Sequence, residues 1–260
     1  MLVLSAPPVR ATIDAARGGR LASVEVRGFE LLVSHDDAAR VGGGRHADPM
    51  TWGSYPMVPW AGRVRRGRFG FVGGTYQLPI NLPPHAIHGT GFTRNWEVQG
   101  DQSLVTDLGP SWPFGGHAVQ RFALTPTSLT CTLEVHNDVR TMPAQVGWHP
   151  WFRRPVSLTF AARSMYLRDA EGIPTGETIA PPSGPWDDCF TDVVASPKLS
   201  WPRGPSVALT STCDHWVIFD EPSHAVCVEP QTGPADGLNL APRLVEPGAP
   251  LVETMVWTWT

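Results

Sequence analysis

LTCTLEVH, residues 129–136, alternates apolar and polar side chains over its whole length. The apolar members are Leu129, Cys131, Leu133 and Val135. Successive side chains of a β-strand point to opposite faces, so all four would lie on one side of an extended chain. The stretch therefore predicts a strand with one face in a hydrophobic core.

The same signals recur elsewhere in the chain. Residues 251–260 alternate in a similar way, with threonine at positions 254, 258 and 260. Residues 68–78 predict a hairpin, because RFGFV and TYQL flank Gly73 and Gly74, a pair that permits the positive φ angles of a tight turn. Further strand candidates are residues 21–27, 95–99, 118–124, 216–220 and 225–228.

Proline and glycine interrupt the chain too often for long helices, with 27 prolines and 26 glycines among 260 residues. Residues 173–186 contain four prolines and little periodicity, and we expect them to form a long surface loop. Many short strands with frequent turns favour a β-sandwich or barrel. We expect one all-β domain covering residues 1–260, a size that single sandwiches reach.

Composition narrows the class of protein. Hydrophobic residues make up 42% and charged residues 17% of the chain, as in a compact folded protein. The net charge of −4 gives no reason to expect nucleic acid or an anionic membrane as partner. The N-terminus lacks the basic region of a secretory signal, and no run of apolar residues is long enough to span a membrane. The four cysteines show no CxxC spacing, so we expect a reduced, cytoplasmic protein.

Polar residues interrupt the apolar pattern in four segments. The first is NLPPHAIHGTGF, residues 81–92, where His88 precedes two closely spaced glycines that allow a ligand to approach the backbone. His88 could equally be a hydrogen-bonded structural histidine. A metal-binding pair with His85 is disfavoured, because the two would share a face only on a helix and prolines precede them.

The second segment is VGWHPWF, residues 146–152, in which His149 lies between tryptophans and before a proline that keeps it extended. An imidazole can be neutral or protonated near pH 7, which suits proton donation to an ether oxygen. Its alternative role is to fill an aromatic cluster.

The third segment is AVCVEPQTGPADGLN, residues 225–239, where an apolar, strand-like run ends in Glu229. A carboxylate at the end of a buried strand loses hydration, which raises its pKa towards the range of a general base. It could also simply leave the sheet for solvent. The fourth segment is WDDCF, residues 186–190, where Asp187 and Asp188 could form either a turn or part of a site.

Read together, the segments resemble the aldose 1-epimerase family. The stretches that carry the resemblance follow one another in family order: PMVPWAGRVRRGRF (56–69), HAIHGTGF (85–92), GWHPWF (147–152), DDCF (187–190) and VEPQTGPADGLN (228–239). The resemblance implies a galactose-mutarotase-like β-sandwich, often called a supersandwich. It also implies that the chain interconverts the α and β anomers of a free aldohexose in an open cleft, with a small sugar as its partner and without cofactor or metal.

The same resemblance implies roles for individual residues. Glu229 matches the general base that takes the proton of the anomeric hydroxyl, and His149 matches the general acid that protonates the ring oxygen. We expect the two on opposite sides of the anomeric centre. The sugar would be bound by His88, Arg63 and Asp187, although Asp188 could replace Asp187. Aromatic side chains in the matching segments could stack on the sugar ring: Trp60, Trp148 and Trp151.

One position departs from the family pattern, since Gly62 precedes Arg63 where many members have asparagine. Three alternatives stay open at this stage. The substrate could be a hexose phosphate bound by arginines near the site (Arg65, Arg66, Arg68 and Arg94), which we interpret as a solvated hairpin face. The protein could bind sugar without catalysis, or use His88, His149 and Glu229 as metal ligands. The sequence does not choose between a monomer and a homodimer or identify the aldose.

Overall fold

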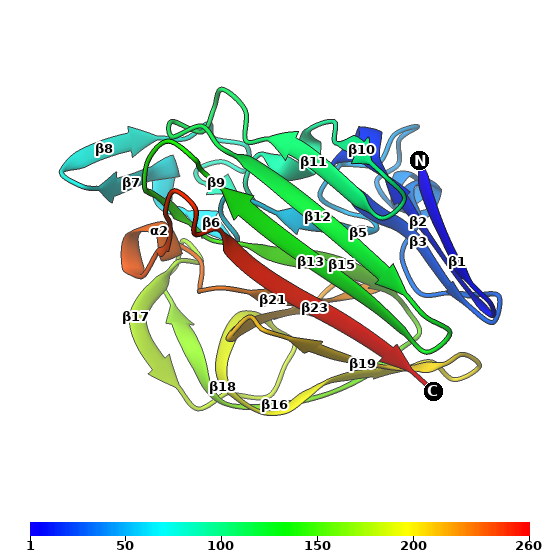
Figure 1. Cartoon of the computed structure of the whole chain (residues 1–260). Helices are drawn as coiled ribbons and strands as arrows, with labels where there is room; N and C mark the ends of the chain where they lie inside the picture. Colours follow the sequence, from blue (N-terminus) through cyan, green and yellow to red (C-terminus); the bar gives the residue numbers. More distant parts are fainter.

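The computed structural model describes residues 1–260 and consists mainly of antiparallel strands, as predicted (Figure 1). Seventeen strands belong to one hydrogen-bonded network, and six more form three small two-stranded sheets. The two α-helices are short, α1 (His35–Val41) and α2 (Gly237–Leu240). None of the helices has the length and apolar character needed to cross a membrane.

The network divides into two layers. The first layer contains, in order of pairing, β1 (Leu2–Ala6), β2 (Val9–Asp14), β3 (Arg20–Val26), β5 (Ser54–Met57), β15 (Gly147–Arg153), β21 (Ala225–Gln231) and β20 (His215–Phe219). The second contains β10 (Glu97–Gln99), β11 (Ser103–Asp107), β12 (His117–Leu124), β13 (Ser128–His136), β23 (Leu251–Trp259) and β19 (Ser206–Ser211). In Figure 1 the second layer lies in front of β5, β15 and β21.

Two long strands join the layers. β18 (Asp187–Ser200) pairs with β20 near its start and with β19 near its end, so it belongs to both. β16 (Ser157–Arg168) runs beside β18, and β17 (Pro174–Ile179) pairs with the end of β16. The result is a sandwich that is closed along one side.

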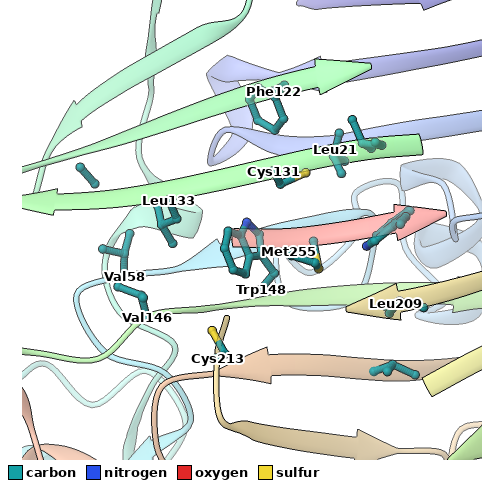
Figure 2. Packing of buried hydrophobic residues seen from close by; sticks show 14 of the residues in the cluster. Leu21, Val58, Phe122, Cys131, Leu133, Val146, Trp148, Leu209, Cys213 and Met255 are labelled. Carbon is teal, nitrogen blue, oxygen red and sulfur yellow. The ribbon is translucent and has the colours of Figure 1, made fainter. Parts of the chain in front are cut away.

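The hydrophobic core fills the space between the layers, as the alternation of residues 129–136 predicts. The burial of β13 alternates along its whole length. Figure 2 shows Cys131, Leu133 and Met255 from the second layer near Trp148 of β15 and near Val146, which directly precedes β15. β15 and β21 are instead buried on both faces. One face of these two strands packs into the core, and the other is free to form the floor of a site.

The smaller elements surround this frame. They are β4 (Phe29–Glu30), β6 (Arg63–Val64) paired with β9 (Ala86–Ile87), β7 (Arg68–Phe71) paired with β8 (Gly74–Gln77), and β14 (Met142–Ala144) paired with β22 (Arg243–Val245). Three single 3-10 turns complete the chain: Ala15–Arg17, Arg65–Gly67 and Gly91–Thr93.

Two local expectations need correction. The hairpin β7–β8 forms, but its turn residues are Val72 and Gly73, with φ angles of 46° and 75°, because the register pairs Phe69 with Tyr76 and their rings stack. Residues 173–186 are also not a continuous loop, since β17 lies within them. The exposed side chains of β17 give no alternation, and a proline is tolerated as the first residue of such a strand.

Candidate active site

A row of side chains crosses the first layer on the face away from the core. β15 and β21 pair at Gly147–Gln231 and at Trp151–Cys227. This register places His149 opposite Glu229. Tyr55 lies beside His149 on β5, and Val217 lies beside Glu229 on β20. All four line one cleft of about 240 Å³. Strand pairing thus brings together residues that are far apart in the sequence.

Glu229 lies within β21 rather than at its end, since the strand continues to Gln231. The apolar run stops at Val228 because the next position faces the cleft, while backbone pairing goes on. The expected desolvation is present, since Glu229 is 2% exposed.

His149 and Glu229 are immediate neighbours on the cleft floor. Nε2 of His149 lies 3.2 Å from Oε1 of Glu229. The imidazole stacks on the rings of Tyr55 and Trp151, at centroid distances of 4.8 and 5.4 Å. We expected the two groups on opposite sides of the anomeric centre, but they are adjacent. Adjacent groups can still serve one anomeric centre, because both sugar oxygens that exchange protons are bonded to the same carbon.

Burial moves the two pKa values in opposite directions. The pKa of Glu229 is raised well above 4.5 by burial and by repulsion from Asp187, against the attraction of Arg63. The pKa of His149 is lowered to about 3, first by burial and also by the positive charge of Arg20. The pair therefore favours a protonated carboxyl and a neutral imidazole. Transfer of that one proton to His149 yields a carboxylate base and an imidazolium acid.

His88 joins this pair from a different part of the chain. Its ring lies edge-on to His149 at a centroid distance of 5.0 Å, and it is buried. Burial, followed by repulsion from His149 and Arg63, lowers its pKa well below 6.5. The next residue must be glycine, because a Cβ on Gly89 would lie 2.0 Å from the carbonyl oxygen of Val58. This close approach fixes the segment that carries His88.

Charged residues form another wall of the cleft. Arg63 lies 3.3 Å from Asp187, which also lies 3.2 Å from Arg168. Arg168 is 2.6 Å from Asp188 as well. Both aspartates line the cleft, but it is the charge of Asp187 that acts on Glu229, which favours Asp187 as the residue nearer the reacting centre. Arg168 was not identified from the sequence, since it lies in no matching segment.

The tryptophans separate into two groups. All three are buried, but Trp151, which is 6% exposed and packs in a smaller hydrophobic cluster, also lines the cleft, whereas Trp60 and Trp148 belong to the main core and do not line it. The structure therefore leaves Trp151, and not Trp60 or Trp148, at the cleft, where its ring already stacks on those of His149 and His224. Trp148 faces the core because it directly precedes His149, and adjacent residues of a strand point to opposite faces.

Gly62 also lines the cleft. Its φ angle is +65°, and an added Cβ would lie 3.1 Å from Cα of Ala235. An asparagine at this position would be strained in the present backbone. The departure from the family pattern is thus accommodated by close packing against Ala235.

The four arginines considered for phosphate binding do not line the cleft. Arg65 and Arg66 form ion pairs with Glu171, and Arg94 pairs with Asp107. Arg68 is exposed at the start of β7. The charges of three of these arginines are therefore already balanced by carboxylates.

One group of side chains has donor atoms of the kinds that bind metals. His149, Cys227 and Glu229 place one donor atom each within 4.8 Å of one another. Burial raises the pKa of the Cys227 thiol well above 9, which opposes the thiolate that a metal requires. Cys227 also does not line the cleft. The geometry therefore suits proton exchange between His149 and Glu229 better than metal binding.

The sequence model of the aldose 1-epimerase family matches residues 4–238 of the chain. The chain is also similar to the uncharacterized protein YphB of Escherichia coli K12, with 38% identity over 130 residues, which are 47% of this chain and 45% of YphB. It spans about half the length of the curated relatives it matches.

Solved structures share the fold. A galactose mutarotase-like protein from Clostridium acetobutylicum has a TM-score of 0.83 at 17% identity, covering 99% of this chain and 94% of that one. A galactose 1-epimerase from Lactobacillus acidophilus has a TM-score of 0.80 at 17% identity, covering 99% and 93%. These likenesses confirm the expected galactose-mutarotase-like sandwich.

Proposed function

Because the chain belongs to the aldose 1-epimerase family, we propose that it interconverts the α and β anomers of a free aldohexose. Glu229 acts as the general base and His149 as the general acid. The observation that carries the proposal is the contact of 3.2 Å between these two buried groups on the floor of the cleft. An acid and a base held in place each contribute about 10²- to 10⁴-fold to a rate.

The reaction needs one proton on the pair. The Glu229 carboxylate takes the proton of the hydroxyl on C1, and the His149 imidazolium gives its proton to the ring oxygen. The bond between C1 and the ring oxygen breaks, which leaves an open-chain aldehyde. After rotation about C1–C2 the ring oxygen attacks the other face of the aldehyde, its proton returns to His149, and Glu229 gives its proton back to the oxygen on C1. His149 and Glu229 carry every proton transfer of this cycle, so the proposed mechanism uses no cofactor.

The remaining cleft residues bind the sugar. Arg63 and His88 donate hydrogen bonds to sugar oxygens, Asp187 accepts them from hydroxyls, and Trp151 contributes an apolar part of the cleft lining. Arg63 also opposes the rise in the pKa of Glu229, so it favours the carboxylate form that the reaction uses.

The charges of the cleft favour a free sugar over a sugar phosphate. The arginines that line it, Arg63 and Arg168, are both paired with aspartates. Asp48 adds a further carboxyl group to the lining. A phosphate group would therefore meet repulsion without a free arginine to offset it.

An NMR measurement of anomer exchange across free and phosphorylated aldoses tests this function. We expect accelerated exchange of free aldohexoses and little acceleration of glucose 6-phosphate. Faster exchange of the phosphate would instead support a hexose-phosphate mutarotase. Sugar binding without faster exchange would indicate a carbohydrate-binding protein of the same fold.

A further inference from the structure

Arg20, the first residue of β3, is buried, and its hydrogen bonds all go to backbone carbonyls. Nε donates to Arg17 at 2.7 Å, Nη1 to Pro49 at 2.8 Å and Trp52 at 3.0 Å, and Nη2 to Phe92 at 3.1 Å. Burial lowers its pKa to about 10, so the guanidinium remains charged at pH 7. A buried charge without an ionic partner is costly, and its presence calls for an explanation.

The carbonyls held by Arg20 belong to two walls of the cleft. Pro49 and Trp52 flank a segment whose residues Met50 and Thr51 line it. Phe92 is the last residue of the segment 81–92, which carries His88. A single planar side chain therefore ties both walls to the first layer, which fixes their spacing.

Aromatic rings connect the guanidinium of Arg20 with the reacting pair. Its Cζ lies 4.2 Å from the ring centroid of Trp52 and 5.3 Å from that of Tyr55. Tyr55 in turn stacks on His149. Carbonyl dipoles and aromatic faces leave the net positive charge uncancelled, whereas a carboxylate partner would neutralise it.

We propose that Arg20 is a positioning residue for proton exchange between His149 and Glu229. Its hydrogen bonds fix the cleft walls, and its positive charge acts on the shared proton across the ring of Tyr55. The inference rests on the proposed function of the pair. A nearby positive charge makes it easier for the pair to lose its proton and harder for it to gain a second. Arg20 therefore shifts both limits of the active pH range downward.

Other charged or titratable groups act on the same pair from the surrounding elements. They are Tyr55 on β5, Arg63 on β6, His88 in residues 81–92, Asp187 and Cys189 on β18, and Cys227 on β21. Asp14 and Asp48 act on Arg20 itself. A substitution of Arg20 leaves all of these side chains in the chain, and a lysine at this position keeps the charge, so it separates the effect of the charge from that of the hydrogen bonds.

The test compares Arg20→Met, Arg20→Lys and the wild type. Arg10→Met is the matched control, since Arg10 is exposed on the neighbouring strand β2. The first readout is the dependence of kcat/KM on pH. The second is independent of activity: infrared titration of the protonated Glu229 carboxyl, identified as the band that Glu229→Gln lacks.

We expect Arg20→Met to move both limits of the pH profile, and the infrared titration, upward by on the order of one pH unit. Arg20→Lys should keep the wild-type limits but show a several-fold higher KM, because an ammonium cannot hold all the carbonyls. Arg10→Met should match the wild type in every readout. Should Arg20→Met fail to fold, Arg20→Gln serves as the neutral variant.

Two results would overturn the inference: a neutral variant that loses activity with unchanged pH limits and infrared titration, or a lysine variant that shifts them as far as methionine does. A wild type without accelerated exchange would count against the proposed function instead. The infrared titration would still decide whether the charge of Arg20 acts on the pair.

Discussion

His149 and Glu229 face each other from adjacent antiparallel strands, and their Nε2 and Oε1 atoms lie 3.2 Å apart at the floor of the cleft. Strand pairing fixes this separation, because a shift of one residue in either strand would turn one of the two side chains into the core. The pair can hold and exchange a single proton without movement of the backbone.

Replacement of Glu229 by glutamine should abolish accelerated mutarotation with the fold intact. Glutamine fills the same space but cannot take the proton from the hydroxyl on C1, so we expect a loss of about 10²-fold or more. Polarimetry on a freshly dissolved anomer measures the rate, and circular dichroism checks the fold. A folded variant with the wild-type rate would refute the role of Glu229.

The two histidines should differ in their effects. His149→Asn removes the acid and should lose most of kcat, whereas His88→Asn should raise KM and lower kcat together, because His88 contacts the sugar beside the pair. Separate kcat and KM values from polarimetric progress curves distinguish the two outcomes. Full activity in both variants would show that neither imidazole is the acid.

The rate should depend on pH through the number of protons that His149 and Glu229 hold together. Burial lowers the pKa of His149 to about 3, so a second proton is bound only in strongly acidic solution. Burial raises the pKa of Glu229 well above 4.5, so the last proton is lost only as the pH rises through that higher value. We therefore expect kcat/KM to remain high at pH 5, where a free imidazole is mostly protonated. A single acid limb near pH 6.5 would contradict the shared-proton mechanism.

Glu229→Gln should gain stability relative to the wild type as the pH rises above about 4.5. The folded-state pKa of Glu229 is raised, so its contribution to stability is fully present below the unfolded value of 4.5 and is lost as the pH rises through the folded value. In that window the free energy of unfolding of the wild type should fall relative to the variant by up to about 1.4 kcal/mol per pH unit. Urea unfolding of both proteins at several pH values measures the difference. A stability difference between the two proteins that does not change with pH would contradict burial as the main cause of the shift.

A chelator should leave the rate unchanged. The proposed steps use the His149 nitrogen and the Glu229 oxygen as proton carriers, which a bound metal would occupy. Dialysis against EDTA, followed by metal analysis and polarimetry, checks this expectation. Lost activity that returns with a divalent ion would favour His88, His149 and Glu229 as metal ligands.

Much of the cleft could be predicted from the sequence because its residues lie in short, distinctive segments. His149, Glu229, His88, Arg63 and Asp187 all line it. These residues come together because their strands pair with strands far away in the sequence. Local patterns indicate each strand but do not show which strand it pairs with. The proposed catalytic roles of these residues remain predictions.

Local sequence patterns did not predict other features of the site and the fold. Arg168 and Arg20 are single arginines among many, and only tertiary contacts distinguish them. The alternation of β15 could have excluded Trp148, because adjacent residues of a strand point to opposite faces. The hairpin turn was misplaced by one residue because the stacking of Phe69 on Tyr76 sets the register, and this contact is not evident from the glycines alone.

The most direct test of the shared proton is a double-mutant cycle with Glu229→Gln, His149→Asn and the double variant, using anomer exchange of a free aldohexose by NMR. If the two side chains act as one unit, the double variant should be no slower than the slower single variant. Losses that multiply in the double variant would show that the two residues act independently and would contradict the account.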